Sequence, residues 1–214
     1  MAERKRPRRT RERIVETSLQ LFNRDGAPHV TTADIADEMG ISPGNLYYHF
    51  RNKDQIIAEL FAAFEQRLER LFAAPTGRIA DVEDLWLFLH LLFEAMWEYR
   101  FLYRDLDEIL SRHDKLEMRF TRLIDRGRHT MLQLCSGMVA AGAMEASQAE
   151  IAALADNVAL VATYWMSYQK IASGGRGREP FSLDRAAYQV LSLIGPFLRG
   201  PSRTLLARLS LGYL

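Results

Sequence analysis

Residues 41–53 read ISPGNLYYHFRNK, and this stretch decides the fold. Ser42 is suited to cap a helix, and Pro43 fits the first helical position, where no N–H donor is needed. At about 100° per residue, Leu46 and Phe50 fall on one side of that helix, which predicts that this side is buried. The opposite side is polar and aromatic: it carries Asn45, Tyr48 and His49, with Tyr47 at its boundary and Gly44 leaving backbone exposed.

A second short helix is predicted immediately upstream, beginning at Thr31 or Thr32. Asp34 follows Thr31 by three residues, the spacing at which hydroxyl and carboxylate groups satisfy unpaired backbone N–H groups at a helix start. Gly40 stands where a helix end favours a left-handed residue, so only a three-residue turn remains before the next helix. Two helices joined in this way can place the second in the major groove of DNA. A structural helix hairpin is the alternative interpretation, but an exposed face without acidic residues favours an anionic partner.

The segment before these helices is basic. Apolar residues spaced by three and four predict a helix over 10–25, and residues 1–9 are expected to form a basic, disordered arm. In residues 1–53 ten lysines and arginines stand against seven acidic residues, a charge of +3, whereas the rest of the chain carries −2. Such an arm attracts phosphate without needing a fold. A solvated surface tail with no binding partner is an equally good interpretation of the same residues.

Composition excludes several classes of protein. The 214 residues are 48% hydrophobic and 26% charged, which is ordinary for a soluble globular protein. The single cysteine, Cys135, cannot form an intramolecular disulfide, and the basic N-terminal residues are not followed by an apolar signal segment. The most apolar run, residues 85–97, is too short to cross a bilayer. These features predict a cytoplasmic protein with no membrane partner.

Residues 31–36 and 41–53 together resemble the TetR family of bacterial transcriptional regulators. The resemblance covers roughly residues 10–61, and Leu-Tyr-Tyr-His-Phe followed three residues later by lysine is more restrictive than a generic helix-turn-helix. It implies a homodimer that binds a double-stranded DNA operator, with Lys53 meeting a phosphate. A predicted cap formed by Asn52 and Gln55 would place Lys53 at a helix N-terminus, itself an anion site. The DNA-binding residues implied are Thr32, Ala33, Ser42, Gly44, Asn45, Tyr47, Tyr48, His49 and Lys53.

Beyond residue 53 the hydrophobic pattern is helical, so we expect an all-α fold. Residues 10–53 would form the helix-turn-helix DNA-binding domain, joined by a long helix to a larger effector-binding and dimerisation domain over residues 54–214. Glycines in residues 174–177 predict a linker. Small residues in the last two long helices and the resemblance together imply a homodimer through residues 150–172 and 183–198. The expected helices beyond residue 53 are 53–73, 82–98, 102–109, 115–141, 150–172 and 183–198, the last kinked near residues 195–196 and followed by an amphipathic tail.

The larger domain carries aromatic and methionine side chains that could line an adaptable apolar pocket, with core packing as the alternative. Apolar residues occupy nearly every side of 82–98, which predicts burial all round. His90 and Glu94 share one face there and need partners, either each other with a neighbour such as Arg100, or a ligand or metal. The candidate effector-binding residues are Trp86, His90, Phe93, Glu94, Trp97, Met131, Tyr164 and Tyr168.

The leading hypothesis is a repressor released from its operator by an uncharged apolar or aromatic small molecule, with no cofactor and no metal. A helical-bundle enzyme using His90, Glu94 and His129 is a second hypothesis. Neither Glu-x-x-His nor His-Glu-x-x-His occurs in the chain, so the usual metal-binding motifs of such enzymes are missing and we expect no enzymatic activity. A ligand-independent DNA-binding protein or an activator is the third.

Overall fold

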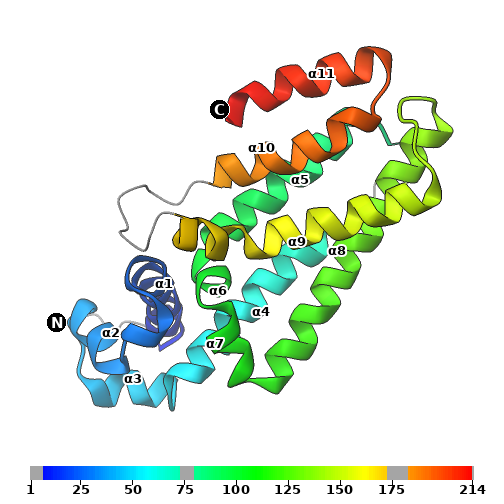
Figure 1. Ribbon diagram of the computed structural model, residues 1–214. Helices are drawn as coiled ribbons and strands as arrows, with labels where there is room; N and C mark the ends of the chain where they lie inside the picture. The colour runs from blue at the N-terminus through cyan, green and yellow to red at the C-terminus, as the bar shows by residue number, and fades with distance from the viewer. Residues whose placement is uncertain (1–6, 73–79, 173–182, 214) are drawn as a thin grey trace. The chain divides into compact units, whose positions relative to one another are not determined.

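The computed structural model describes residues 7–72, 80–172 and 183–213, and within these ranges the regular structure is helical (Figure 1). The expected all-α fold class is confirmed, whereas the linker expected at 174–177 lies outside the described residues. No helix in the described ranges is both long and apolar enough to span a membrane. The helices are α1 (Pro7–Asp25), α2 (Thr32–Glu38), α3 (Pro43–His49), α4 (Lys53–Leu71), α5 (Val82–Glu98), α6 (Arg100–Arg104), α7 (Leu106–Ser111), α8 (Asp114–Ala140), α9 (Gln148–Ala172), α10 (Leu183–Ile194) and α11 (Gly200–Ser210), with 3₁₀ turns at Ala27–His29, Gly195–Phe197 and Leu211–Tyr213.

The chain divides into two compact units. The first unit is Met1–Gln66 with Tyr99–Glu117, and the second is Arg67–Glu98 with Met118–Leu214. Helices α4 and α8 each contribute residues to both units. The functional division at residue 53 stays a prediction.

The first unit has an aromatic core. Phe22 of α1 packs against Phe101 of α6, with ring centroids 5.4 Å apart. Phe64 of α4 lies 5.5 Å from the Tyr99 ring and 5.9 Å from the Tyr103 ring. Because burying an aromatic side chain contributes strongly to stability, α6 and α7 are integral to this unit. The sequence pattern instead assigned residues 99–117 to the larger domain.

The second unit is a helical bundle in which α10 packs against α9, α5 and α11 (Figure 1). The α5 boundaries and the cap by Asp81, which accepts a hydrogen bond from the Asp84 N–H over 3.0 Å, are as predicted. The predicted burial of α5 on all sides is wrong. Leu87, Leu91 and Trp97 are exposed, because α5 covers the bundle on one side only.

Other helix boundaries also differ from prediction, those of α4, α8 and α9 by one or two residues and three more as follows. Helix α1 begins at Pro7, so residues 7–9 of the expected disordered arm are helical, while residues 1–6 lie outside the described residues. The single helix expected over 102–109 is two helices, α6 and α7, that break at Asp105. Helix α10 ends at Ile194 and passes into a 3₁₀ turn, consistent with the kink expected near residue 195.

Candidate nucleic-acid interface

Helix α2 starts with the predicted capping box. The Thr31 hydroxyl accepts a hydrogen bond from the Asp34 N–H over 3.2 Å, and the Asp34 carboxylate accepts from the Thr31 N–H over 2.7 Å. The bonds from the Thr31 N–H and then from its hydroxyl lower the pKa of Asp34 below its ordinary value. The start of α2 is therefore fixed by its own residues, and Thr32 and Ala33 follow at its first turn.

The turn between α2 and α3 is closed by backbone bonds at Gly40. Gly40 has φ of 62°, and its N–H donates to the Asp37 carbonyl over 3.0 Å. The Ile41 N–H reaches back to the Ala36 carbonyl, also over 3.0 Å. This pair of bonds is the Schellman motif, which needs a residue with positive φ after the helix. The predicted glycine is confirmed, but four residues, 39–42, separate α2 from α3 rather than the predicted three, because Met39 is the C-cap of α2.

Helix α3 presents the face that the sequence predicts. The Ser42 hydroxyl caps the helix by accepting from the Asn45 N–H over 3.2 Å, while Leu46 and Phe50 are buried. On the other side Tyr48 is 79% exposed and Tyr47 is 50% exposed. Among the other predicted DNA-binding residues of this helix, Ser42, Gly44 and Asn45 are exposed and His49 is half-buried.

Two contacts organise the aromatic side chains of this face. The Tyr47 hydroxyl lies 3.0 Å from the Thr32 hydroxyl, so the start of α2 and the middle of α3 meet at one surface. The Tyr48 and His49 rings meet edge to face, with centroids 5.1 Å apart. At Gly44, no atom beyond the adjacent residues and the backbone of its own helix lies within 4 Å of the position that a Cβ would occupy. The predicted residues of α2 and α3 therefore share one open face.

Lys53 has a structural role that the sequence did not show. Its ammonium donates to the carbonyls of Ala27 and Val30 over 2.6 and 3.0 Å, and so holds the segment between α1 and α2. Burial lowers the pKa of Lys53, and the charge of Arg112 lowers it further. An ammonium has three N–H donors, and two are used here. The predicted phosphate contact of Lys53 stays a prediction.

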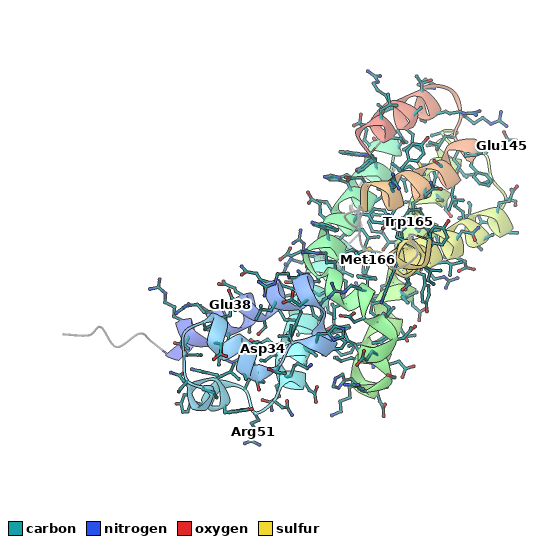
Figure 2. The ribbon with its side chains drawn as sticks, turned by 60° about the vertical axis from the view of Figure 1, so that its left-hand side comes forward. Asp34, Glu38, Arg51, Glu145, Trp165 and Met166 are labelled. Atoms are coloured by element: carbon teal, nitrogen blue, oxygen red, sulfur yellow. The ribbon has the colours of Figure 1, made fainter. Side chains whose placement is uncertain are left out.

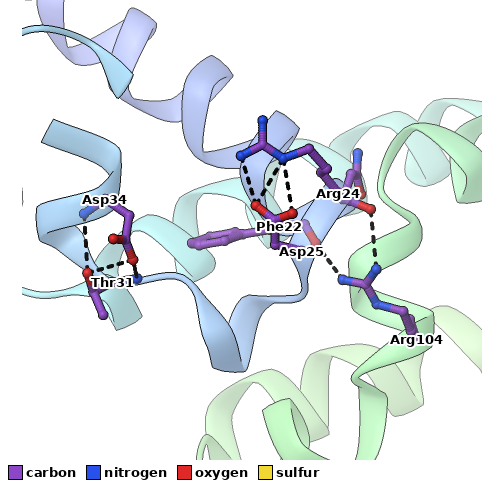
Figure 3. A network of polar contacts seen from close by, with 7 residues as sticks. Phe22, Arg24, Asp25, Thr31, Asp34 and Arg104 are labelled. Carbon is purple, nitrogen blue, oxygen red and sulfur yellow. Dashed lines mark hydrogen bonds and ion pairs between the residues drawn. The ribbon is translucent and has the colours of Figure 1, made fainter. Parts of the chain in front are cut away.

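A second set of bonds holds the end of α1 (Figure 3). The Arg104 guanidinium donates to the carbonyls of Phe22 and Asn23 over 2.6 and 3.3 Å. The adjacent Asp105 carboxylate accepts from the Ala27 N–H over 2.9 Å. The Asn23 carbonyl is among the groups that a helix end leaves without a helical partner, whereas the Phe22 carbonyl also accepts from the Gly26 N–H over 3.0 Å. Sequence reasoning missed Arg104 and Asp105, because they lie about 80 residues away from the groups they bind.

Arg51 is a further basic residue beside α3 that the prediction omitted. Its side chain is exposed, and Figure 2 shows it apart from the acidic Asp34 and Glu38 of α2. Its backbone N–H donates to the Gln55 side chain over 2.9 Å, and the Asn52 side chain accepts from the Gln55 N–H over 3.0 Å. The predicted cap of α4 is therefore present, and it fixes the backbone from which Arg51 extends.

The structure does not bring the eight predicted effector-binding residues into one cluster. Phe93 and Met131 are buried core residues, and Trp97 is exposed on α5. Tyr164 and Tyr168 lie on an exposed side of α9. The other three predicted residues, Trp86, His90 and Glu94, share one face of α5.

His90 lies at the centre of that α5 group. Its ring stacks on Trp86 with centroids 5.1 Å apart and an interplanar angle of 11°. Its Nδ1 atom lies 2.7 Å from the Tyr213 hydroxyl oxygen, and its Nε2 atom lies 3.5 Å from a Glu94 carboxylate oxygen. His90 and Glu94 are therefore neighbours as predicted, and Tyr213 is a further neighbour of His90. Within residues 7–72, 80–172 and 183–213, no cluster of three histidine, cysteine or acidic residues could hold a metal ion.

Helices α2 and α3, their glycine turn and the open face of α3 define a helix-turn-helix DNA-binding regulator. The family model for bacterial regulatory proteins of the tetR family matches residues 14–60. A second model, described as a bacterial transcriptional repressor of the TetR type, matches residues 63–206. The chain belongs to the TetR family of bacterial transcriptional regulators.

Individual relatives agree with this assignment. A solved TetR-family regulator from Marinobacter aquaeolei VT8 is 34% identical, with a TM-score of 0.83 over 95% of this chain and 98% of that one. A regulator from Saccharomonospora viridis, solved in complex with choline, shares the fold with a TM-score of 0.69 at 21% identity, over 90% of this chain and all of that one. The regulator TtgW of Pseudomonas putida is 32% identical over 68 residues, which are 32% of this chain and about half (51%) of TtgW. The predicted class, a DNA-binding transcriptional regulator, is confirmed.

Proposed function

We propose that the protein represses transcription as a homodimer that inserts its two α3 helices into an operator and leaves it when a small molecule binds. The observation that carries the proposal is the exposed α3 face, where Tyr48 is 79% exposed and Gly44 has open space beside it. Hydroxyl, amide and imidazole groups on this face suit contacts to phosphates and base edges. The predicted contacts to DNA are those of Thr32, Ala33, Ser42, Gly44, Asn45, Tyr47, Tyr48, His49 and Lys53, to which we add Arg51.

The DNA contact is tested with an operator selected from a random DNA pool. Tyr48→Ala should weaken binding to that operator at least about tenfold, because its exposed side chain would contact DNA. Met118→Ala removes an exposed apolar side chain from α8 and should leave the affinity unchanged. If Tyr48→Ala binds the operator as tightly as the wild type, α3 is not the reading helix.

The dependence of binding on salt gives a second test. Neutralising phosphates releases counterions, so operator affinity should fall steeply between 50 and 200 mM salt, by about 10³-fold for six phosphate contacts in a dimer. Arg51→Gln should make that fall shallower without changing the melting temperature. An affinity independent of salt would contradict the proposed phosphate contacts.

The homodimer is supported by an exposed apolar stripe on α9. Leu160, Tyr164, Tyr168 and Ile171 are spaced by four, four and three residues and are between 47% and 78% exposed. Such spacing places them on one side of the helix, and large exposed apolar patches mark interaction surfaces. We therefore assign Tyr164 and Tyr168 to the dimer interface rather than to the effector site. The exposed residues of α10 are polar, among them Arg185, Gln189 and Ser192, so α9 would supply most of the apolar contact.

The stripe is tested by introducing charge. Ile171→Glu should convert the dimer into a monomer in analytical ultracentrifugation, because a carboxylate would be buried without a partner in the interface. Leu87→Glu places the same charge at an exposed leucine of α5 and should leave the dimer intact. A dimer that persists in Ile171→Glu would refute this interface.

The release by a small molecule is supported by chain continuity and by one relative. Helices α4 and α8 each contribute residues to both compact units. A conformational change in the second unit can therefore be transmitted along these two helices to the first unit. The relative from Saccharomonospora viridis was solved with choline bound. A coupling of about 1–3 kcal/mol would change operator affinity about 5- to 150-fold. If no uncharged aromatic compound in a screen changes operator affinity, release by such a ligand is refuted.

A further inference from the structure

Two polar atoms of α9 are buried without a hydrogen-bond partner. The indole nitrogen of Trp165 and the amide oxygen of Gln169 are completely covered, and neither has a partner in the part of the chain that the structure describes. Buried polar atoms in proteins nearly always have a partner, and the exceptions call for an explanation such as a bound group. The Trp165 indole N–H is therefore an unpaired donor, and the Gln169 amide oxygen is an unpaired acceptor on the next turn of the same helix.

Both residues lie on the side of α9 that faces the interior of the bundle. Gln169 follows the buried Ile151 by 18 residues, about five turns at 3.6 residues per turn, so the two share one side. Trp165 follows the buried Leu154 by 11 residues, about three turns. Figure 2 shows Trp165 next to the buried Met166; Trp165 and Gln169 as whole side chains are half-buried. The indole N–H and the amide oxygen therefore lie among buried residues of α9 that are apolar apart from Thr163, on the side opposite the exposed stripe of Leu160 and Ile171.

The chemistry of the two atoms restricts what can bind them. An indole N–H can only donate a hydrogen bond, and an amide oxygen can only accept one. Side chains four residues apart on a helix have Cβ atoms about 5–6 Å apart, so one small group would reach both atoms once the side chains that cover them move aside. A hydroxyl group is the smallest group that does so, because it accepts from Trp165 and donates to Gln169. Neither side chain is charged, which favours an uncharged ligand.

We propose that Trp165 and Gln169 are the hydrogen-bonding pair of the effector site, and that the effector is an uncharged, largely apolar molecule carrying a hydroxyl group. Phenols and ring alcohols are the simplest members of this class. The inference rests on the proposed function, because it assigns residues and a ligand class to the same effector site. It replaces Tyr164 and Tyr168 of the predicted set by two residues of the interior side of α9.

The test measures binding to the full-length dimer without DNA by isothermal titration calorimetry. Three matched pairs of probes differ only by a hydroxyl or a methyl group: phenol and toluene, 2-naphthol and 2-methylnaphthalene, and 4-phenylphenol and 4-methylbiphenyl. The hydroxyl member of at least one pair should bind at least tenfold more tightly, and Trp165→Phe and Gln169→Leu should each reduce that preference below threefold. No preference in any pair, or the same preference in both variants, overturns the proposal.

A second measurement does not require a ligand. Because replacing an unpaired buried polar group by an apolar group of similar shape is neutral or stabilising, Gln169→Leu should keep or raise the melting temperature of the ligand-free protein. Gln189→Leu changes an exposed glutamine of α10 and serves as the matched control. A melting temperature lowered by Gln169→Leu but not by Gln189→Leu would show that the amide already has a partner, such as a buried water, and would overturn the proposal.

Operator release is measured separately, so that the two proposals can fail independently. A compound that releases the operator equally from the wild type, Trp165→Phe and Gln169→Leu supports the proposed function and overturns this inference. A hydroxyl preference that depends on Trp165 and Gln169 without any change in operator affinity supports this inference and refutes release by that ligand.

Discussion

Replacing Arg104 by alanine should destabilise the DNA-binding unit by about 2 kcal/mol. The guanidinium donates to the Phe22 carbonyl over 2.6 Å and, more weakly, to the Asn23 carbonyl over 3.3 Å. Hydrogen bonds from charged groups contribute about 1.5–3 kcal/mol, and the side chain is only 19% exposed, so little of this is replaced by water. The substitution also leaves the half-buried Asp105 carboxylate without its neighbouring cation.

The effect can be measured by urea or thermal unfolding followed by circular dichroism. For a protein of this length, about 2 kcal/mol corresponds to a fall in melting temperature of about 4–8 °C. Arg104→Lys should recover less than half of the loss, because one ammonium cannot reproduce the two-pronged geometry of the guanidinium. Figure 3 also shows Arg24, whose ion pair with Asp25 involves two exposed side chains. Arg24→Ala is therefore the matched control, and it should leave the melting temperature unchanged. If the Arg104→Ala protein has the same melting temperature and the same urea midpoint as the wild type, the assigned role of Arg104 is refuted.

Three other substitutions or reactions test particular features. Gly44→Ala should keep or slightly raise the melting temperature, since a Cβ there meets nothing and alanine favours a helix, yet weaken operator binding by steric contact with DNA; unchanged operator affinity would contradict a close approach at Gly44. Ser42→Ala removes the α3 cap and should cost about 1 kcal/mol in urea unfolding, whereas Ser192→Ala, which removes an exposed hydroxyl of α10, should cost less than about 0.5 kcal/mol; equal losses would argue against the cap. Burial raises the pKa of the Cys135 thiol to about 11, so at pH 8 it should react with Ellman's reagent roughly 100-fold more slowly in the folded protein than in urea, and equal rates would show that the thiol is accessible.

The helix-turn-helix was predictable from sequence because its signals are local. The capping box at Thr31, the left-handed Gly40 and the Ser42 cap each involve residues within a few positions of one another. A single sequence contains all the information that these motifs need. Predictions of the exposed side of α3 succeeded for the same reason, since Leu46 and Phe50 left only one way to orient the helix.

Features set by distant residues were not predictable. The break between α6 and α7 occurs at Asp105, whose carboxylate bonds to Ala27, 78 positions away. The sides of α9 gave a related difficulty, because apolar residues lie both on its interior side and on its exposed stripe. Periodicity shows that such residues share a side of the helix, but not whether that side meets the core or another protein. Periodicity alone placed Tyr164 and Tyr168 in the predicted effector site, and their proposed place in the dimer interface rests on their exposure.

The partnership of α6 and α7 with the first 66 residues also bears on protein engineering. A fragment cut after residue 53 would leave the ring of Phe22 without Phe101, and the end of α1 without Arg104 and Asp105. A chimera that swaps DNA specificity should therefore transplant residues 7–66 together with 99–117, or re-create their shared contacts in the host. The transferable cassette in this protein is discontinuous along the chain.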